Sequence, residues 1–122
     1  MKIKPRKILY LAPSLLLMSG CVATVTESGY YWGKYANTLY DYEKTPSEET
    51  MLAHKTELES IINESEQRQL KTPPGVHAEL GFLHAKLGNQ QQASSNYQKE
   101  MALYPESTLF LERLITQQQE GQ

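Results

Sequence analysis

The clearest structural pattern in the chain is carried by residues 76–105, VHAELGFLHAKLGNQQQASSNYQKEMALYP. Apolar residues recur in its first half at spacings of four, three and four, which is the periodicity of one helix face. They are Val76, Leu80, Leu83 and Leu87. Gly88-Asn89 is typical of a helix end, and a second set of apolar residues then leads up to Tyr104-Pro105. The stretch therefore predicts two helices joined by a short turn.

Residues 74–107 resemble a single tetratricopeptide repeat, a helical hairpin of about 34 residues. The resemblance depends on a Leu-Gly pair, a turn glycine, a small residue, an aromatic residue and a closing proline. These are Leu80, Gly81, Gly88, Ala93, Tyr97 and Pro105. The resemblance implies that the helices cross closely at Gly81 and Ala93, with Tyr97 filling the space between them. Three positions depart from the usual Trp, Tyr and Ala of the repeat: His77, His84 and Glu100.

Helical patterns also lie on both sides of this hairpin, and the chain has almost no strand pattern. A first helix is expected over residues 31–44. A second follows Thr45-Pro46-Ser47-Glu48, which reads as a capping box with Thr45 as the N-cap, and frays near residues 66–70. A last helix after Pro105 would cap the exposed apolar face of the hairpin. Its apolar residues are Leu109, Leu111, Leu114 and Ile115. We expect an all-α fold of about five helices for residues 30–122, with TPR-like hairpins and a C-terminal capping helix.

Residues 1–20 have the layout of a secretory signal peptide, with a basic head, an apolar stretch from Ile8 to Met18 and the small pair Ser19-Gly20. The apolar stretch has about half the length that a helix needs to cross a bilayer. Met18-Ser19-Gly20-Cys21 resembles the lipobox of bacterial lipoproteins, which implies cleavage before Cys21 and acylation of this residue. The alternative is an ordinary secretory signal with an incidental or structural cysteine.

The lipid on Cys21 is the only attached group that the sequence predicts, and no cofactor is expected. Val22 follows the cysteine. In lipoproteins of the enterobacterial type, a residue other than Asp at this position is associated with export to the outer membrane. We therefore expect a protein anchored to the periplasmic face of the outer membrane. Residues 21–29 would form the lipidated cysteine and a short tether, which at no more than about 3.5 Å a residue reaches less than roughly 30 Å.

Loss of the signal peptide makes the remaining chain acidic. The chain has 12 Lys and Arg against 14 Asp and Glu, and four of the basic residues lie in the signal peptide. Eight basic residues then remain against 14 acidic ones, a formal charge of −6. Because nucleic-acid binding needs clustered cations, nucleic acid is excluded as a partner. General adhesion to anionic lipid is disfavoured for the same reason.

The stretch GYYWGKY, residues 29–35, resembles the opening motif of a family of small, uncharacterised bacterial lipoproteins. These are frequently encoded beside a lipoprotein related to the curli secretion channel. The resemblance brings no activity with it. It implies that the partner is an outer-membrane lipoprotein or a component of a secretion or assembly system. Two roles stay open: an accessory or assembly factor that binds a protein partner, and a permanent structural subunit of a lipoprotein complex.

The resemblance to tetratricopeptide repeats also implies a concave, partner-binding face on the first helix of the hairpin. The positions that line it are Ala78, Phe82, Ala85 and Lys86. A large aromatic residue between two alanines would form a shallow apolar slot for a partner helix or an extended peptide. The alternative is that the preceding helices cover Phe82 as ordinary core.

A second docking surface is expected among the aromatic residues of the first helix. At about 100° per residue, one face of a helix over residues 31–44 should pack against the second helix. That face carries Trp32, Tyr35, Ala36, Leu39 and Tyr42. Tyr30 would then project from the opposite side and Tyr40 from a flank. We expect these two tyrosines to contact a partner or the headgroup region of the membrane.

The sequence does not predict an enzyme. It has no glycine-rich phosphate loop, no Cys-His pair and no Ser-His-Asp order around a strained turn. His77 and His84 are seven residues apart, which separates them by about 10 Å along a helix and favours packing roles over metal binding. His54 and Glu57 lie close enough on a helix for a hydrogen bond on a solvated face. No catalytic residue and no metal site is therefore expected.

Overall fold

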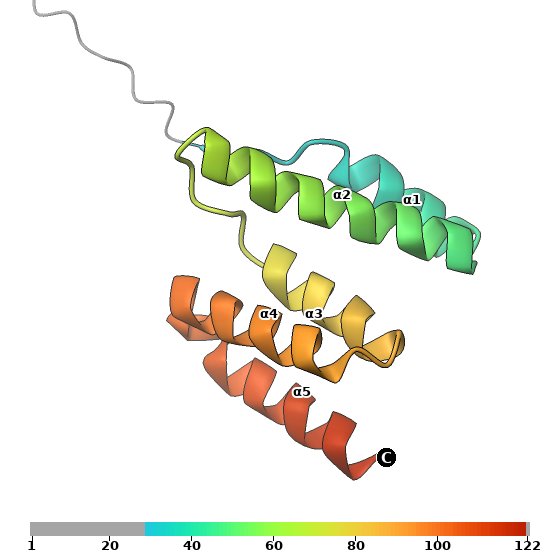
Figure 1. Cartoon of the computed structure of the whole chain (residues 1–122), viewed down its shortest axis with the longest axis vertical. Coiled ribbons are helices and arrows are strands. Elements are labelled where there is room, and N and C mark those ends of the chain that lie inside the picture. Colours follow the sequence, from blue (N-terminus) through green and yellow to red (C-terminus); the bar gives the residue numbers. More distant parts are fainter. Residues whose placement is uncertain (1–28, 122) are drawn as a thin grey trace, which may run out of the picture.

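The computed structural model describes residues 29–121, and this part of the chain is built from helices joined by short loops (Figure 1). The elements are α1 (Tyr35–Lys44), α2 (Glu48–Gln67), α3 (Val76–Lys86), α4 (Gln90–Leu103), the short 3-10 helix η1 (Pro105–Ser107) and α5 (Thr108–Glu120). The prediction of an all-α fold with about five helices is confirmed for these residues. The predicted signal peptide, Cys21 and the tether up to residue 28 lie outside the described residues.

The helices form two antiparallel pairs followed by a single helix. Consecutive helices pack against one another, α1 on α2, α2 on α3, α3 on α4 and α4 on α5. Figure 1 shows α1 and α2 at one end of this stack and α5 at the other. The stack therefore exposes an outer helix surface at each end.

Two apolar clusters hold the stack together. The cluster between α2 and α3 consists of Leu58, Ile61, Val76, Leu80 and Leu83. The cluster between α4 and α5 consists of Ala93, Tyr97 and Leu111. Each fully buried Leu or Ile stabilises the fold by about 1.5–3 kcal/mol. Short helices are marginal in isolation, so the individual helices depend on this packing.

Gly81 allows α3 and α4 to cross closely. A Cβ atom at this position would lie 2.7 Å from Cε1 of Tyr97 and 3.0 Å from the carbonyl oxygen of Ala93. Tyr97 and Ala93 are both buried. The expectation of a close crossing at two small residues, with Tyr97 between the helices, is confirmed.

Two of the three departures from the repeat pattern form buried polar contacts between α3 and α4. Glu100 is 2% exposed, and its carboxylate accepts the backbone N–H of Gly75 at 2.7 Å and that of Ala78 at 3.3 Å. Nδ1 of His77 lies 3.0 Å from Oδ1 of Asn96. Glu100 therefore satisfies N–H groups at the start of α3 that have no partner within the helix.

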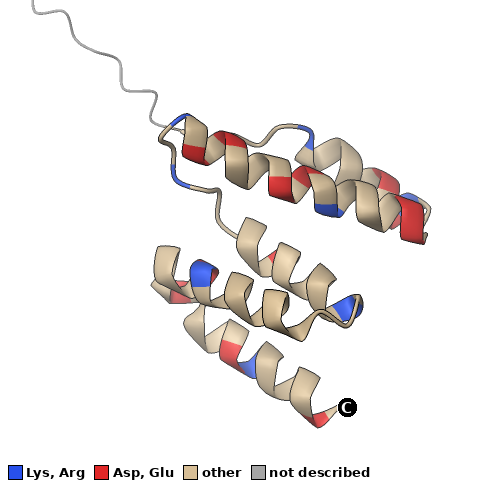
Figure 2. Ribbon diagram, viewed as in Figure 1, with Lys and Arg blue, Asp and Glu red and all other residues tan. Residues whose placement is uncertain are grey.

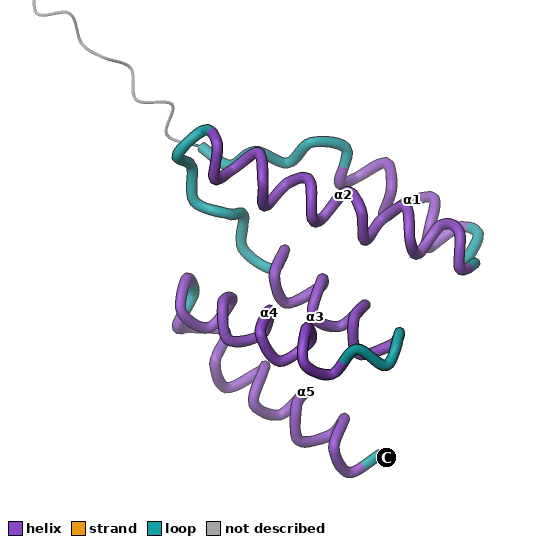
Figure 3. The backbone as a smooth tube through the Cα atoms, viewed as in Figure 1, coloured by secondary structure: helices purple, strands orange, loops and turns teal. Residues whose placement is uncertain are grey.

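The first helix begins at Tyr35, and the residues before it run as a loop beside α2 (Figure 3). Gly33 has a φ of +47°, which a right-handed helix does not allow. The backbone N–H of Lys34 donates to Oε1 of Glu57 in α2 at 2.6 Å. The predicted helix start at Tyr31 is therefore wrong, because contacts with α2 fix a non-helical conformation.

The aromatic face expected on the first helix is only partly buried. Trp32, which is 41% exposed, and Ala36 face solvent, contrary to the prediction. Trp32 precedes the helix, so the helical periodicity that grouped it with Tyr35 does not apply. Tyr35 and Tyr42 do pack against the α2–α3 cluster.

The capping box of α2 lies two residues beyond the predicted one. Oγ of Ser47 accepts the N–H of Thr50 at 3.1 Å, and Oγ1 of Thr50 accepts the N–H of Ser47 at 3.0 Å. Thr45 already serves as the C-cap of α1, where its N–H donates to the carbonyl of Asp41. The predicted assignment of Thr45 as the N-cap is therefore wrong, although the capping motif itself is present.

Charged side chains are more frequent on the α1–α2 pair than on the later helices (Figure 2). α3 carries only Glu79 and Lys86, and α4 only Lys99 and Glu100. α3 and α4 therefore present a mainly uncharged surface.

Candidate functional site

A groove between α3 and α5 is the main concave feature that places predicted site residues side by side. Its first pocket, of about 310 Å³, is lined by Gly75, Ala78, Glu79, Phe82, Phe110 and Leu114. An adjoining pocket of about 320 Å³ is lined by Phe82, Ala85, Lys86, Gln90, Gln118 and Gly121. Phe82 lines both pockets. We call these two pockets together the α3–α5 groove.

The structure brings together the four residues that the repeat resemblance placed on a concave face. Ala78, Phe82, Ala85 and Lys86 all line the α3–α5 groove. Phe82 keeps 39% of its surface exposed, so the preceding helices do not cover it as core. Across from it, Phe110 is 66% exposed. Two accessible phenylalanines thus line a groove that also contains the small residues Gly75, Ala78 and Ala85.

Lys86 holds a positive charge at one end of the groove. Its Nζ donates to the hydroxyl of Tyr42 at 3.0 Å and lies 5.2 Å from the ring centroid of Phe82. The contact with Tyr42 joins α3 to α1 and fixes the position of the ammonium group. Because Lys86 remains exposed, this charge is available to an acidic group on a bound molecule.

Sequence reasoning missed Phe110 as a groove residue. It treated the apolar residues of the last helix as one packing face, whereas Leu111 is fully buried and its neighbour Phe110 points outward. Phe110 and Leu114 are four residues apart and form a second apolar stripe, which lines the groove. The i, i+4 spacing of Phe110 and Leu114 is the sequence pattern that could have identified this wall of the groove.

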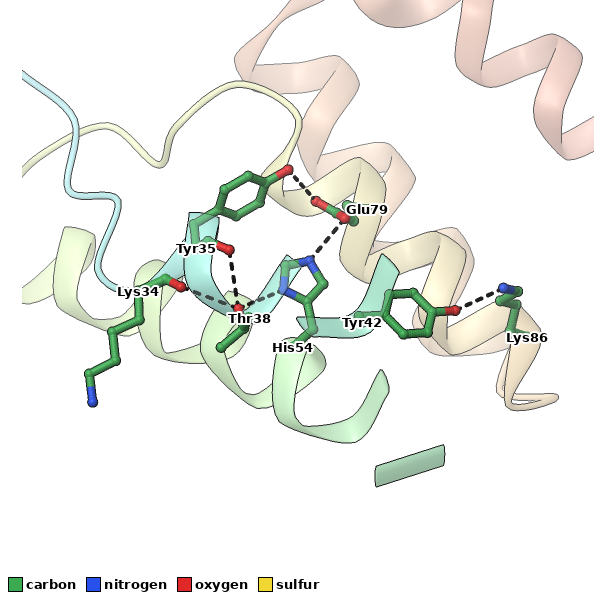
Figure 4. A network of polar contacts seen from close by, with 7 residues as sticks. All are labelled: Lys34, Tyr35, Thr38, Tyr42, His54, Glu79 and Lys86. Atoms are coloured by element: carbon green, nitrogen blue, oxygen red, sulfur yellow. Dashed lines mark hydrogen bonds and ion pairs between the residues drawn. The ribbon is translucent and has the colours of Figure 1, made fainter. Parts of the chain in front are cut away.

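A polar network joins α1, α2 and α3 beside the groove (Figure 4). His54 is fully buried, with Nδ1 2.8 Å from Oγ1 of Thr38 and Nε2 2.9 Å from Oε1 of Glu79. The hydroxyl of Tyr35 donates to the other oxygen of Glu79 at 2.8 Å. Since an ionised carboxylate only accepts hydrogen bonds, Nε2 of His54 carries the proton.

The prediction that His54 pairs with Glu57 on a solvated helix face is wrong. Glu57 instead accepts the backbone N–H of Lys34, and His54 points into the helix interface toward Glu79. Its ring also packs on Tyr35 and Tyr42. Burial, and then the hydrogen bond to the Glu79 carboxylate, raises the pKa of Tyr35 well above its ordinary value.

The two histidines of α3 face different surroundings. His77 contacts Asn96 of α4, whereas Lys55 and Glu59 of α2 are the charged groups that act on His84. Burial, with a smaller effect of Lys55, holds the pKa of His84 below its ordinary value, while Glu59 opposes this shift. Both side chains therefore pack at helix contacts, and residues 29–121 contain no group of three or more His, Cys, Asp or Glu residues that could hold a metal ion.

The two predicted docking tyrosines lie outside the groove. Tyr30 is 45% exposed and Tyr40 is 60% exposed, and neither lines the groove pockets. Nζ of Lys44 lies 5.4 Å from the ring centroid of Tyr40. The structure therefore places both tyrosines on the surface, apart from the residues that line the groove.

Residues 30–114 match the family described as Domain of unknown function (DUF4810). The chain belongs to this family. Comparison with curated proteins and with solved structures found no match. The match to the DUF4810 family begins at Tyr30 and ends at Leu114. All residues that line the first groove pocket therefore lie within the match.

No helix within residues 29–121 of the DUF4810 chain is both long and apolar enough to cross a membrane. The family description names no activity. The groove and the other exposed residues are therefore the candidate functional features of the described domain.

Proposed function

We propose that this DUF4810 protein is a periplasmic lipoprotein, anchored to the outer membrane through Cys21, that acts as an accessory or assembly factor. Its helical domain binds a protein partner in the α3–α5 groove. The partner is an outer-membrane lipoprotein or a secretion or assembly component. The domain works by binding, without a catalytic step.

The observation that carries this proposal is the pair of exposed phenylalanines across the groove. Phe82 on α3 and Phe110 on α5 line one pocket with Ala78 and Leu114. Exposed aromatic residues over small neighbours are typical of sites that receive an apolar anchor from another protein. The charged residues that line the groove are Glu79, which already accepts hydrogen bonds from His54 and Tyr35, and Lys86.

The groove chemistry defines the segment that would fit. The first pocket favours an aliphatic or aromatic side chain, and the neighbouring pocket places Lys86 next to Phe82. A partner helix with apolar residues at i and i+3 or i+4, followed by an acidic residue, satisfies both pockets. An extended peptide with an apolar anchor and a nearby carboxylate is the other segment that fits.

The outer face of α5 supports the second role, that of a permanent structural subunit. Leu109 is 61% exposed and borders a pocket of about 280 Å³ with Glu112, Arg113, Thr116 and Gln117. A helix that ends a stack usually turns a polar face outward. An apolar residue on this outer face favours a further helix that packs against α5 in a stable complex.

The anchor is tested by replacing the predicted lipidation residue. Cys21→Ser removes the sulfur that would be acylated, so we expect an uncleaved or soluble periplasmic species in fractionated cells. Two or more acyl chains suffice for stable anchoring, and a protein without them has no comparable attachment. Normal processing and retention of the variant in the outer membrane in high salt would contradict the proposal.

The groove is tested by photo-crosslinking in cells that express the full chain. A photoreactive residue at Phe82 should give one major adduct with an outer-membrane or secretion component, identified by mass spectrometry. The matched control is Ser60, which is exposed on α2 away from the groove residues. The same adducts at both positions would count against the groove.

A stoichiometric complex after mild detergent extraction would favour the subunit role, and a monomer that captures a client would favour the assembly factor.

A further inference from the structure

Two aromatic residues stand exposed at the point where the described chain begins. Tyr30 is 45% exposed and Trp32 is 41% exposed, and their ring centroids are 6.4 Å apart in an edge-to-face arrangement. Trp32 also contacts Tyr35 edge to face, with the centroids 5.3 Å apart. We call Tyr30 and Trp32 the N-terminal aromatic pair.

The loop that carries this pair is fixed to the domain. The N–H of Lys34 donates to Glu57, and the N–H of Tyr35 donates to the carbonyl of Trp32 at 3.0 Å. Between the two exposed rings, Tyr31 turns inward to the core and lies under the guanidinium of Arg68, 4.3 Å from its ring centroid. The two exposed rings are thus presented on an ordered base.

The predicted anchor lies only a short length of chain away. Eight residues, 22–29, separate Cys21 from Tyr30, so Tyr30 can lie no more than about 32 Å from the lipidated residue. Tyr and Trp combine an apolar ring with a polar group, and for this reason they accumulate at the boundary between lipid headgroups and hydrocarbon. The position and the chemistry of the pair therefore match the surface of the membrane that holds the anchor.

We infer that the N-terminal aromatic pair rests in the headgroup region of that membrane, as a second contact beside the acyl chains. This inference rests on the proposed anchoring at Cys21. The contact does not depend on anionic lipid, because the mature chain is acidic and the two rings are uncharged. Two attachments restrict the rotation of the domain, so the α3–α5 groove is held in one orientation to the membrane.

The chain contains a single tryptophan, so its own fluorescence reports on Trp32 without labelling. The test uses the full, acylated protein, with acylation verified by mass spectrometry, reconstituted in vesicles of phosphatidylethanolamine and phosphatidylglycerol. We expect a shift of the emission to shorter wavelength and a fall in acrylamide quenching by about half, because the headgroup region excludes the aqueous quencher. Lipids brominated near the headgroup should quench the emission more than lipids brominated near the bilayer centre.

The matched control moves the tryptophan to the opposite end of the stack. In the double variant Trp32→Phe with Gln119→Trp, the fluorophore sits at an exposed position of α5 far from the N-terminal aromatic pair, and brominated lipids should quench it less. Equal lipid quenching at the two positions would overturn the inference, as would acrylamide quenching of Trp32 that is the same with and without vesicles. A chain without acyl groups would refute the proposed anchoring itself, whereas an acylated chain with a solvent-exposed Trp32 would refute only the second contact.

Discussion

His54 and Glu79 face each other across the contact between α2 and α3, with 2.9 Å between Nε2 and Oε1. Both partners also reach α1, through Thr38 and Tyr35 respectively. This pair is therefore the centre of the polar contacts between the first helix pair and the rest of the stack. It lies close to the groove, since Glu79 also lines the first pocket.

Removal of the Glu79 carboxylate should destabilise the domain. In Glu79→Ala, the buried His54 and the hydroxyl of Tyr35 lose their acceptor, and an unsatisfied buried group costs about 1–3 kcal/mol. We expect the free energy of unfolding to fall by about this amount in urea denaturation. The control is Glu59→Ala, which removes a helix-surface ion pair with Lys55 and a charge near His84 and should change stability by less than about 1 kcal/mol. Equal effects of the two variants would contradict the role of the network.

Adjacent residues of α5 should separate binding from folding. Phe110→Ala removes an exposed side chain and should change stability by no more than about 0.5 kcal/mol. It should also abolish the crosslink formed from Phe82, because it removes the opposite wall of the groove. Leu111→Ala empties a fully buried site and should cost about 2–5 kcal/mol. Thermal melting of the two variants checks the first expectation, and crosslinking of Phe110→Ala checks the second. A Phe110→Ala protein that still forms the adduct at the normal level would exclude this wall from binding.

Glu100→Ala should destabilise the domain although Ala is the usual residue of the repeat at this position. The carboxylate of Glu100 accepts two backbone N–H groups at the start of α3, those of Gly75 and Ala78. Loss of the carboxylate leaves these partly buried donors without this acceptor, at a cost of about 1–3 kcal/mol. Hydrogen exchange should accelerate at these two amides more than at the far end of α3. An unchanged or higher melting temperature would contradict the capping role.

The stability of the domain should depend on pH through His84. Its folded-state pKa lies below the ordinary value of 6.5, mainly because it is buried. As pH falls through 6.5, the unfolded chain binds a proton at this position before the folded chain does, so the free energy of unfolding decreases. His84→Leu removes this site, together with a buried Nδ1 that has no hydrogen-bond partner within residues 29–121. The variant should show a smaller loss of melting temperature between neutral and mildly acidic pH, and parallel curves for the two proteins would contradict this assignment.

The helical hairpin of α3 and α4 was predictable because its signals are local. The spacing of Leu80, Leu83 and Leu87 indicates α3, and the turn at Gly88 separates it from α4, without information from the rest of the chain. The close crossing at Gly81 followed from the repeat resemblance. The same resemblance predicted the four groove residues of α3. One wall of the candidate site could therefore be predicted from the sequence.

The remaining features depend on contacts between distant residues. The loop before α1 is fixed by the hydrogen bond from Lys34 to Glu57, 23 residues away, and no local pattern encodes it. His54 lies 25 residues from Glu79, so its nearest acidic neighbour in the helix, Glu57, was a misleading partner. Helical periodicity alone therefore could not find the exposed Trp32 or the buried network.

The loop beside α2 also determines how the domain responds to mechanical force. A pull on the N-terminus acts first on the segment from Gly29 to Lys34, which is held to α2 by the hydrogen bond to Glu57 and the stacking of Arg68 on Tyr31. These contacts can be lost one after another while the helices stay folded. Detachment of these six residues frees up to about 20 Å of chain. Tension on the N-terminus is thus borne first by the hydrogen bond of Lys34 and by the ring of Tyr31, which packs against the α2–α3 cluster, and only then by the helices.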